Sequence, residues 1–329
     1  MAHPAQAAVG SVIARWRGPV RVLRGRPGTV RAVVAALGLA VLLAGLAPAQ
    51  GTQAAAATRV VRYGPFTIPA GTATAPGTLH DQLRLGVARP CADCHITAFA
   101  PDLVYADGTR ATMETGPMLH HAVFASLFQR DATCGGTAVG LAGERFFGSG
   151  DERTAIAFPN GYGYRVHANA YWLLLVDLMN HATTSKTVYL QVTYTYRPAA
   201  DSVKQLRPVW LDIDQCGDSR YAIPAGPSDT HWDWNVNVPG RVMAMLGHVH
   251  GHGVAVEATN ESRGRASICK SVATLDPADP HRVLAMSTCQ ADPPAVLKPG
   301  ETVRLHSMYQ SPHAADDVMG IMLAYIDPS

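Results

Sequence analysis

Short runs rich in Val, Ile, Thr and aromatic residues recur along the chain, separated by turn-forming Gly, Pro, Asp and Asn residues. Examples are residues 187–196 (TVYLQVTYTY), residues 302–309 (TVRLHSMY) and the closing apolar run 321–326 (IMLAYI). Long amphipathic helical periodicity is scarce. This pattern predicts a largely β chain folded as a sandwich or barrel. For residues 171–179, periodicity leaves a buried strand and a short helix both open.

The first 49 residues have the composition of an export leader. Six arginines and no acidic residue precede the apolar stretch 32–47, and a small-x-small pattern (Ala-Pro-Ala) follows at 47–49. These parts predict a cleavable signal peptide at 1–49 and a secreted, extracytoplasmic mature protein. The apolar stretch is shorter than the about 20 residues that a membrane span needs, which favours a cleaved signal peptide. A retained membrane anchor is the alternative interpretation. After cleavage we expect no stable membrane association.

Without the leader the charge changes sign. The whole chain has a formal net charge of +2, but residues 51–329 hold 21 basic residues (27 − 6) and 25 acidic residues, which gives −4. No basic patch with interleaved aromatic residues occurs in this part, so we expect no nucleic-acid partner. A break in pattern at 197–202 (RPAADS) predicts a boundary near residue 200, with one domain at 58–200 and a second at 201–329.

All six cysteines follow the leader, and an even number in an exported chain predicts disulfides. The local pairing of Cys269 with Cys289 is favoured, and the other pairings stay open; the six are Cys91, Cys94, Cys134, Cys216, Cys269 and Cys289. Cys91, Cys94 and His95 also form a C-x-x-C-H sequence, which is the attachment signature of c-type haem. A haem protein with His95 as an axial ligand is therefore one alternative.

The main candidate for metal chemistry is the sequence from Gly247 to Gly253 (GHVHGHG). On a strand, residues two apart point to the same face with Cα atoms roughly 6–7 Å apart, so His248 and His250 project together. Two imidazoles at that spacing can bind one metal ion. His252 would share this face, but the flanking glycines favour a turn, and we keep it as a spare ligand.

Two further features support a metal site. His120 and His121 are adjacent, so on a regular strand they would point to opposite faces; they can share one ion if the backbone twists. Met319 precedes the closing apolar strand. A thioether prefers soft copper, especially Cu(I), and two imidazoles with one thioether form a copper set.

The order of these motifs, His-His, then His-x-His, then Met, resembles the copper type II, ascorbate-dependent monooxygenases. It is closer still to the C-terminal half of plant stress-upregulated nodulin-like proteins and their microbial relatives. The residues that carry this second likeness are the two histidine motifs, 267–269 (SIC), 286–289 (MSTC) and 319–320 (MG).

The resemblance implies an all-β fold of two tandem antiparallel jelly-roll sandwiches, each holding one copper ion. His248, His250 and Met319 match the oxygen-activating site, and His120 and His121 match two of the three histidines of the electron-supplying site. The third histidine would lie in 190–194 (LQVTY), where Thr193 stands at the ligand position. This implies an altered second site, for which His95, His167 or His306 could substitute.

These observations predict a secreted protein that binds one or two copper ions. If it is an enzyme, the resemblance implies a copper monooxygenase that uses an ascorbate-like reductant on a small molecule or peptide that the sequence does not identify. A non-catalytic secreted metal-binding or structural protein is the first alternative, favoured by Thr193. The c-type haem protein is the second.

Overall fold

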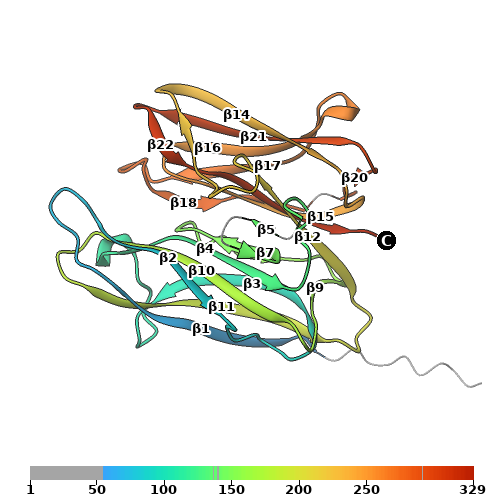
Figure 1. Cartoon of the computed structure of the whole chain (residues 1–329), viewed down its shortest axis with the longest axis horizontal. Coiled ribbons are helices and arrows are strands. Elements are labelled where there is room, and N and C mark those ends of the chain that lie inside the picture. Colours follow the sequence, from blue (N-terminus) through green and yellow to red (C-terminus); the bar gives the residue numbers. More distant parts are fainter. Residues whose placement is uncertain (1–54, 136, 139–140, 291) are drawn as a thin grey trace, which may run out of the picture. The chain divides into compact units, whose positions relative to one another are not determined.

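Antiparallel strands make up most of the described chain (Figure 1). The computed structural model describes residues 55–329 apart from 136, 139, 140 and 291, so the predicted signal peptide lies outside the described residues. Within the described part, no helix is long and apolar enough to cross a membrane.

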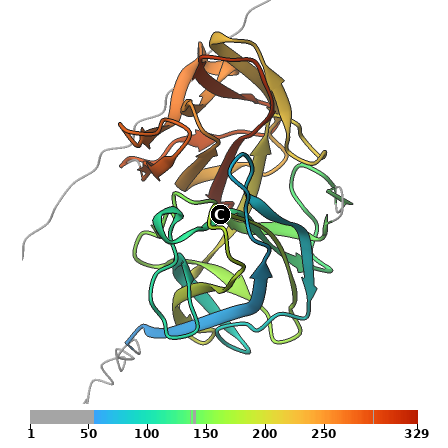
Figure 2. The same ribbon diagram turned by 90° about the vertical axis from the view of Figure 1, so that its left-hand side faces the viewer.

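Two four-stranded layers form the N-terminal sandwich (Figure 2). One layer has the order β1 (Ala57–Ile68), β11 (Lys186–Pro198), β3 (Cys94–Val104) and β9 (Tyr162–Val166), with β8 (Ile156–Ala157) beside β3. The other has the order β2 (Gly77–Leu85), β10 (Tyr171–Asn180), β4 (Pro117–Leu127) and β7 (Glu144–Ser149). Residues 171–179, which periodicity left open, are therefore a strand.

The C-terminal sandwich is built in the same way. Its first layer continues the long sheet through β12 (Lys204–Asp212), β23 (Gly320–Asp327) and β15 (Gly240–Val249), with β19 (Thr288–Cys289) and β20 (Val296–Leu297) on β15. The second layer has the order β14 (Gly226–Asn235), β21 (Thr302–Ser311), β16 (Gly253–Asn260), β17 (Ala266–Leu275) and β18 (Val283–Met286). The prediction of an all-β fold of antiparallel jelly-roll sandwiches is confirmed.

Short elements complete the described chain. They are the strand pairs β5 (Thr137–Ala138) with β6 (Leu141–Ala142) and β13 (Tyr221–Ile223) with β22 (Ala315–Val318), and the 3₁₀ turns η1 (Met113–Thr115) and η2 (Glu261–Arg263). The pairing of β9 with β12 is parallel, and it joins the layers of the two sandwiches into one sheet. The domain boundary near residue 200 stays a prediction.

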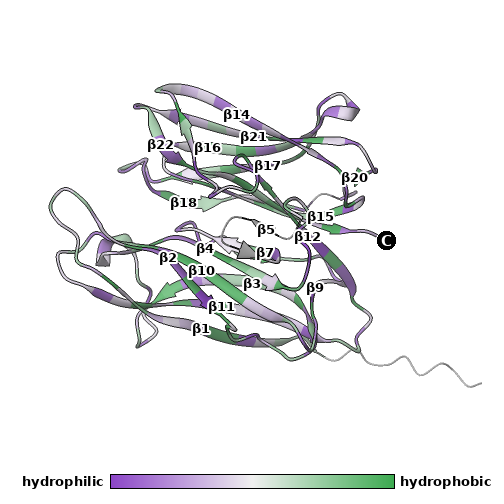
Figure 3. Cartoon of the chain, viewed as in Figure 1, coloured by the Kyte–Doolittle hydropathy of each residue, from purple (hydrophilic) through white to green (hydrophobic). Residues whose placement is uncertain are grey.

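The strands are of two kinds, alternating and continuously apolar, and burial explains the difference. Figure 3 shows the hydropathy of the residues along them. Along β11, Val192 and Tyr194 point into the N-terminal core while Thr193 between them is partly exposed, as alternation requires. Strand β23 is buried on both faces: Leu323 belongs to the core shared with the N-terminal sandwich, and Met322 and Ala324 belong to the C-terminal core. A strand covered on both faces is continuously apolar, as residues 321–326 are.

All six cysteines form disulfides: Cys91–Cys94, Cys134–Cys216 and Cys269–Cys289. The third is the pairing favoured from the sequence. Because Cys91 and Cys94 bond to each other, neither sulfur is free for a thioether bond to haem. The c-type haem alternative is therefore wrong for this structure, and the C-x-x-C-H sequence is a disulfide next to a buried His95 at the start of β3.

Candidate metal centre

An irregularity in β4 brings its two adjacent histidines to the same side. In the pairing of β4 with β10, His121 lies opposite Asp177 and Leu119 opposite Leu178, so His120 has no partner and forms a β-bulge. A bulge redirects side chains that strict alternation would send to opposite faces. The rings of His120 and His121 consequently lie next to each other, with centroids 5.0 Å apart.

The other two histidines reach the same place by ordinary alternation. His248 is the penultimate residue of β15 and His250 follows the strand; their ring centroids are 5.3 Å apart. Gly150 makes room for this arrangement, because a Cβ atom there would lie 2.5 Å from Cε1 of His248.

The two histidine pairs meet in one cluster. The centroids of His120 and His250 are 4.7 Å apart, and ligand atoms of His120, His121 and His250 all lie within 4.8 Å of one another. The resemblance implied two copper sites, one for each sandwich. His250 was expected in the oxygen-activating site, but it lies beside His120 and His121, which were expected in the electron-supplying site. The structure therefore differs from the expectation of two separate sites.

Each ring leaves one nitrogen without a hydrogen bond to the protein. These buried nitrogens are Nδ1 of His120, Nδ1 of His121, Nε2 of His248 and Nε2 of His250. Buried polar atoms are rarely unpaired in folded proteins, so four of them on four neighbouring rings form a set of free donor atoms that one ion could bind.

In three of the four rings, the second nitrogen lies beside a hydrogen-bond acceptor. Nε2 of His121 lies 3.3 Å from a carboxylate oxygen of Asp177, and Nδ1 of His248 lies 3.1 Å from Glu152. Nδ1 of His250 donates to the backbone carbonyl of Asp317 at 2.8 Å. Metal-binding histidines characteristically donate their second N–H to a carboxylate or carbonyl, which fixes the ring and its tautomer.

Burial keeps the imidazoles of His120, His121 and His250 neutral. Desolvation, reinforced by the neighbouring His121, lowers the pKa of His120 to about 3. Desolvation and adjacent histidines also hold the pKa of His121 and of His250 well below the ordinary value. The neutral imidazole is the form that binds a metal ion, so the cluster is ready for one near neutral pH.

Met319 and His250 form hydrogen bonds with the same residue, which places Met319 close to the cluster. The hydroxyl of Tyr309 accepts the backbone N–H of His250 at 2.8 Å and donates to the backbone carbonyl of Met319. Met319 is buried and, with His121 and His248, lines one cavity. The fold thus brings all five predicted ligands to one region, although His248 is not among the three histidines whose ligand atoms converge most closely.

Thr193 is not part of this region. It lies on β11, opposite Val60 and Ala100, in the layer that does not contain β4. The residue that faces His121 from the neighbouring strand is Asp177, within residues 174–178 (LLVDL). Assigning the altered ligand position to Thr193 was therefore wrong, because the motif was matched to a strand of the other layer.

The other candidate histidines also lie elsewhere. Among the described residues, none of His95, His167 and His306 belongs to the cluster; His306, for example, lies on β21 with Nδ1 3.0 Å from Asp229. His252 has a left-handed backbone (φ 63°), and its Nε2 lies 3.2 Å from Nε2 of His281. It is part of a turn, as the flanking glycines indicated.

Three supporting residues were missed from the sequence: Asp177, Glu152 and Tyr309. Asp177 had a usable signal, because a single carboxylate inside an apolar strand needs a buried partner. It accepts the backbone N–H of Asp81 at 2.6 Å besides contacting His121. Glu152 lies in a polar turn after β7 and Tyr309 in an ordinary alternating strand, so neither had such a signal.

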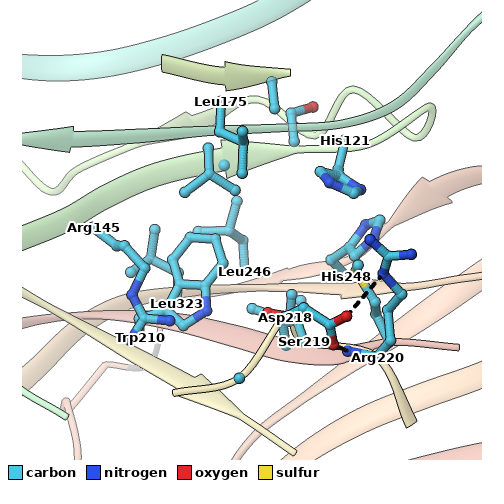
Figure 4. A pocket seen from close by; sticks show the side chains of 18 of the residues that line it. His121, Arg145, Leu175, Trp210, Asp218, Ser219, Arg220, Leu246, His248 and Leu323 are labelled. Atoms are coloured by element: carbon cyan, nitrogen blue, oxygen red, sulfur yellow. Dashed lines mark hydrogen bonds and ion pairs between the residues drawn. The ribbon is translucent and has the colours of Figure 1, made fainter. Parts of the chain in front are cut away.

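A cavity of about 440 Å³ extends from the histidines (Figure 4). His121 and His248 lie at one side of it, and Arg145, Trp210 and Leu323 lie at the other. Apolar side chains from β4, β10, β15 and β23 line the space between. A cavity of this size suits a small organic molecule.

Comparison with known proteins gives relatives over most of the chain. The family model for stress up-regulated Nod 19 matches residues 158–328. "Probable copper-dependent oxygenase M1" from Phoma sp. is 30% identical over 294 residues, which is 82% of this chain and 72% of that protein. "Probable copper-dependent oxygenase clz3" from Cochliobolus lunatus is 30% identical over 68% of this chain and 77% of that protein.

Among solved structures, PNGF-II is similar at a TM-score of 0.37 with 10% identity, covering 82% of this chain and 65% of that chain. The sequence matches are sufficient: the chain belongs to the stress up-regulated Nod 19 family and is related to proteins named as copper-dependent oxygenases.

Proposed function

We propose that this protein is a secreted copper-dependent oxygenase whose copper ion is held by histidines of both sandwiches. The observation that carries the proposal is the set of four buried, unpaired imidazole nitrogens on neighbouring rings, two of which, His121 and His248, line a cavity. His120, His121 and His250 would be the first ligands, with His248 and Met319 beside them. The names of the two fungal relatives agree with copper.

The donor set fits copper better than other common metals. Imidazoles with a nearby thioether suit copper, whereas a carboxylate-rich site would suit Mg²⁺ or Ca²⁺. No cysteine is free to add the thiolate that is common in structural zinc sites, because all six are in disulfides. Asp177 and Glu152 would hold the rings of His121 and His248 in the metal-binding orientation.

The reaction class follows from the cofactor and the cavity. Bound copper supplies reaction with dioxygen. Hydroxylation puts one oxygen atom into a C–H bond and converts the other to water, so two electrons and two protons must come from a reductant such as ascorbate. The apolar cavity walls would position a C–H bond beside the histidines and keep bulk water away from it.

Export is part of the proposal. Three disulfides suit an oxidising compartment, and the leader sequence supplies a route to it. The non-catalytic alternative rested on Thr193, which lies in the other layer, so we do not propose it.

Copper content is the first test. The mature protein, reconstituted with copper and dialysed, should hold one ion per chain, and His250→Ala should lose it. His306→Ala is the matched control, because His306 is also buried but lies on β21 away from the cluster. Full copper in His250→Ala would refute the site. Oxygen uptake with ascorbate, present in wild type and absent in His250→Ala, would then establish oxygenase chemistry.

A further inference from the structure

The cavity wall opposite the histidines contains a buried arginine. Arg145 lies on β7 with 3% of its side chain exposed. Its Nε donates to Asp131 at 2.9 Å and its Nη2 donates to the other oxygen of the same carboxylate at 3.1 Å. Nη2 also lies 3.0 Å from the Thr133 hydroxyl. Two of the three guanidinium nitrogens are therefore fully used within the protein.

The third nitrogen is not. Nη1 of Arg145 has no hydrogen bond to any residue that the structure describes, and Arg145 lines the cavity. The guanidinium also lies over the ring of Trp210, 5.2 Å from the centroid, so its plane is fixed (Figure 4). A rigid donor that is not used within the protein and lies at a cavity wall is free to donate to an acceptor atom of a ligand.

The charge around this donor determines which acceptor it takes. Asp131 is buried and pairs with Arg145 through two hydrogen bonds, so the pair has no net charge. Arg220, another arginine of the cavity wall, is close to Asp218 and Asp317. A ligand carboxylate at Nη1 would create an excess negative charge against apolar walls, which is costly. A neutral carbonyl oxygen would satisfy the donor without that cost.

The space between the two sides of the cavity is apolar. Leu246 lies between Arg145 and the histidines, and Leu175 and Leu323, from two other strands, line the same cavity (Figure 4). A molecule that reached from Nη1 to the metal centre would therefore be mainly hydrocarbon.

From this arrangement we propose that Arg145 is a substrate-binding residue, and that the substrate is an apolar small molecule with a neutral carbonyl group, such as an amide, ester or ketone. The carbonyl oxygen accepts the Nη1–H of Arg145 and the hydrocarbon part extends toward His121 and His248. This inference rests on the proposed function for the reaction but not for the binding.

The test compares two probes that differ only in the polar group, 4-phenylbutyramide and 4-phenylbutyrate. Their binding to the copper-loaded mature protein at pH 7.5 is measured by isothermal titration calorimetry. We expect the amide to bind at least about tenfold more tightly, because an uncompensated buried charge costs more than 1.4 kcal/mol, the equivalent of a factor of ten. Equal affinities, or tighter binding of the carboxylate, would overturn the inference.

Two variants identify the residue responsible. Arg145→Met should bind the amide at least about tenfold more weakly, because it keeps an unbranched side chain but has no donor. Asp131→Asn should leave the guanidinium with a net positive charge and reverse the preference toward 4-phenylbutyrate. An unchanged preference in a folded Asp131→Asn protein would contradict the charge argument. If that variant does not fold, the preference of the wild type decides.

The same titrations in copper-free protein separate this inference from the proposed function. If the protein prefers the amide but fails to bind added copper, the Arg145 site is supported and the copper centre is refuted. If the protein binds copper but shows no preference for the amide, the copper centre is supported and the Arg145 site is refuted.

Discussion

Strands β4 and β15 bring their histidines to one side in different ways. At the end of β15 the spacing of His248 and His250 places both rings on the same side, because alternate residues of a strand point to one face. On β4 the adjacent His120 and His121 need a β-bulge. The first arrangement follows from residue spacing, whereas the second depends on how β4 pairs with β10.

The orienting partners differ in the same way. On β4, Asp177 holds His121 from the directly paired position of the next strand. On the β15 side the partners come from elsewhere in the chain: Glu152 follows β7, and the carbonyl of Asp317 precedes β23. The orientation of His121 therefore depends on the register of one strand pair. That of His248 depends on how the two sandwiches pack, and that of His250 depends on a contact within the C-terminal sandwich.

Removing the bulge should have the largest effect. Deleting His120 leaves His121 opposite Asp177 and Leu119 opposite Leu178, so β4 becomes regular. We expect copper to bind more than about 100-fold more weakly, since losing a ligand should exceed the roughly 10–100-fold cost of losing an orienting partner. His120→Ala, which keeps the bulge, is the control. If the only role of the bulge is to direct His120 toward the ion, the deletion variant and His120→Ala should lose the same copper affinity in competition titrations with a chelator. Wild-type affinity in the deletion variant would exclude His120 as a ligand.

Asp177→Asn and Glu152→Gln compare the orienting carboxylates of the two sides. Each removes the negative acceptor beside one ring and keeps the size of the side chain. We expect copper affinity to fall roughly 10–100-fold in each variant. An effect in Asp177→Asn alone would mean that His248 does not bind the ion, and no effect in either would contradict the assigned ring orientations.

Acid should destabilise the copper-free protein. The pKa of His120 is about 3 in the folded state and 6.5 ordinarily, so below pH 6.5 the unfolded chain binds the proton more readily. The stability that the neutral ring contributes is complete above pH 6.5 and is lost as pH falls toward 3. Between pH 6.5 and 5 this should cost roughly 1–2 kcal/mol for this residue. Denaturant unfolding at both pH values measures it, with His120→Gln as the control that should show a smaller decrease. An equal decrease in both proteins would contradict burial of a neutral ring.

Replacing the thioether should have the smallest effect. Met319→Leu keeps a buried hydrocarbon of similar volume and removes the sulfur. We expect weaker Cu(I) binding, within about tenfold, and nearly unchanged Cu(II) binding, because the thioether is a soft ligand. Parallel titrations of the two oxidation states measure this, and an equal loss of both would indicate a packing defect.

Alternation and turn residues were sufficient to predict the all-β fold, and residue spacing was sufficient to predict that the rings of His248 and His250 are neighbours. Contacts between strands distant in sequence were not predictable in this way. Residues 190–194 (LQVTY) resemble the expected ligand strand in their letters, but residues 174–178 (LLVDL) lie beside β4. Local sequence does not determine which strands pair, so the bulge at His120 and the contact of Asp177 with His121 required the structure.

A crystal structure of the copper-loaded mature protein, with anomalous diffraction measured at the copper absorption edge, would locate the ion. We expect one copper peak per chain, in contact with His120 or His121 of β4 and with His250 beyond β15. Two separate peaks, one bound only by the β4 histidines and the other only by His248, His250 and Met319, would contradict a shared centre.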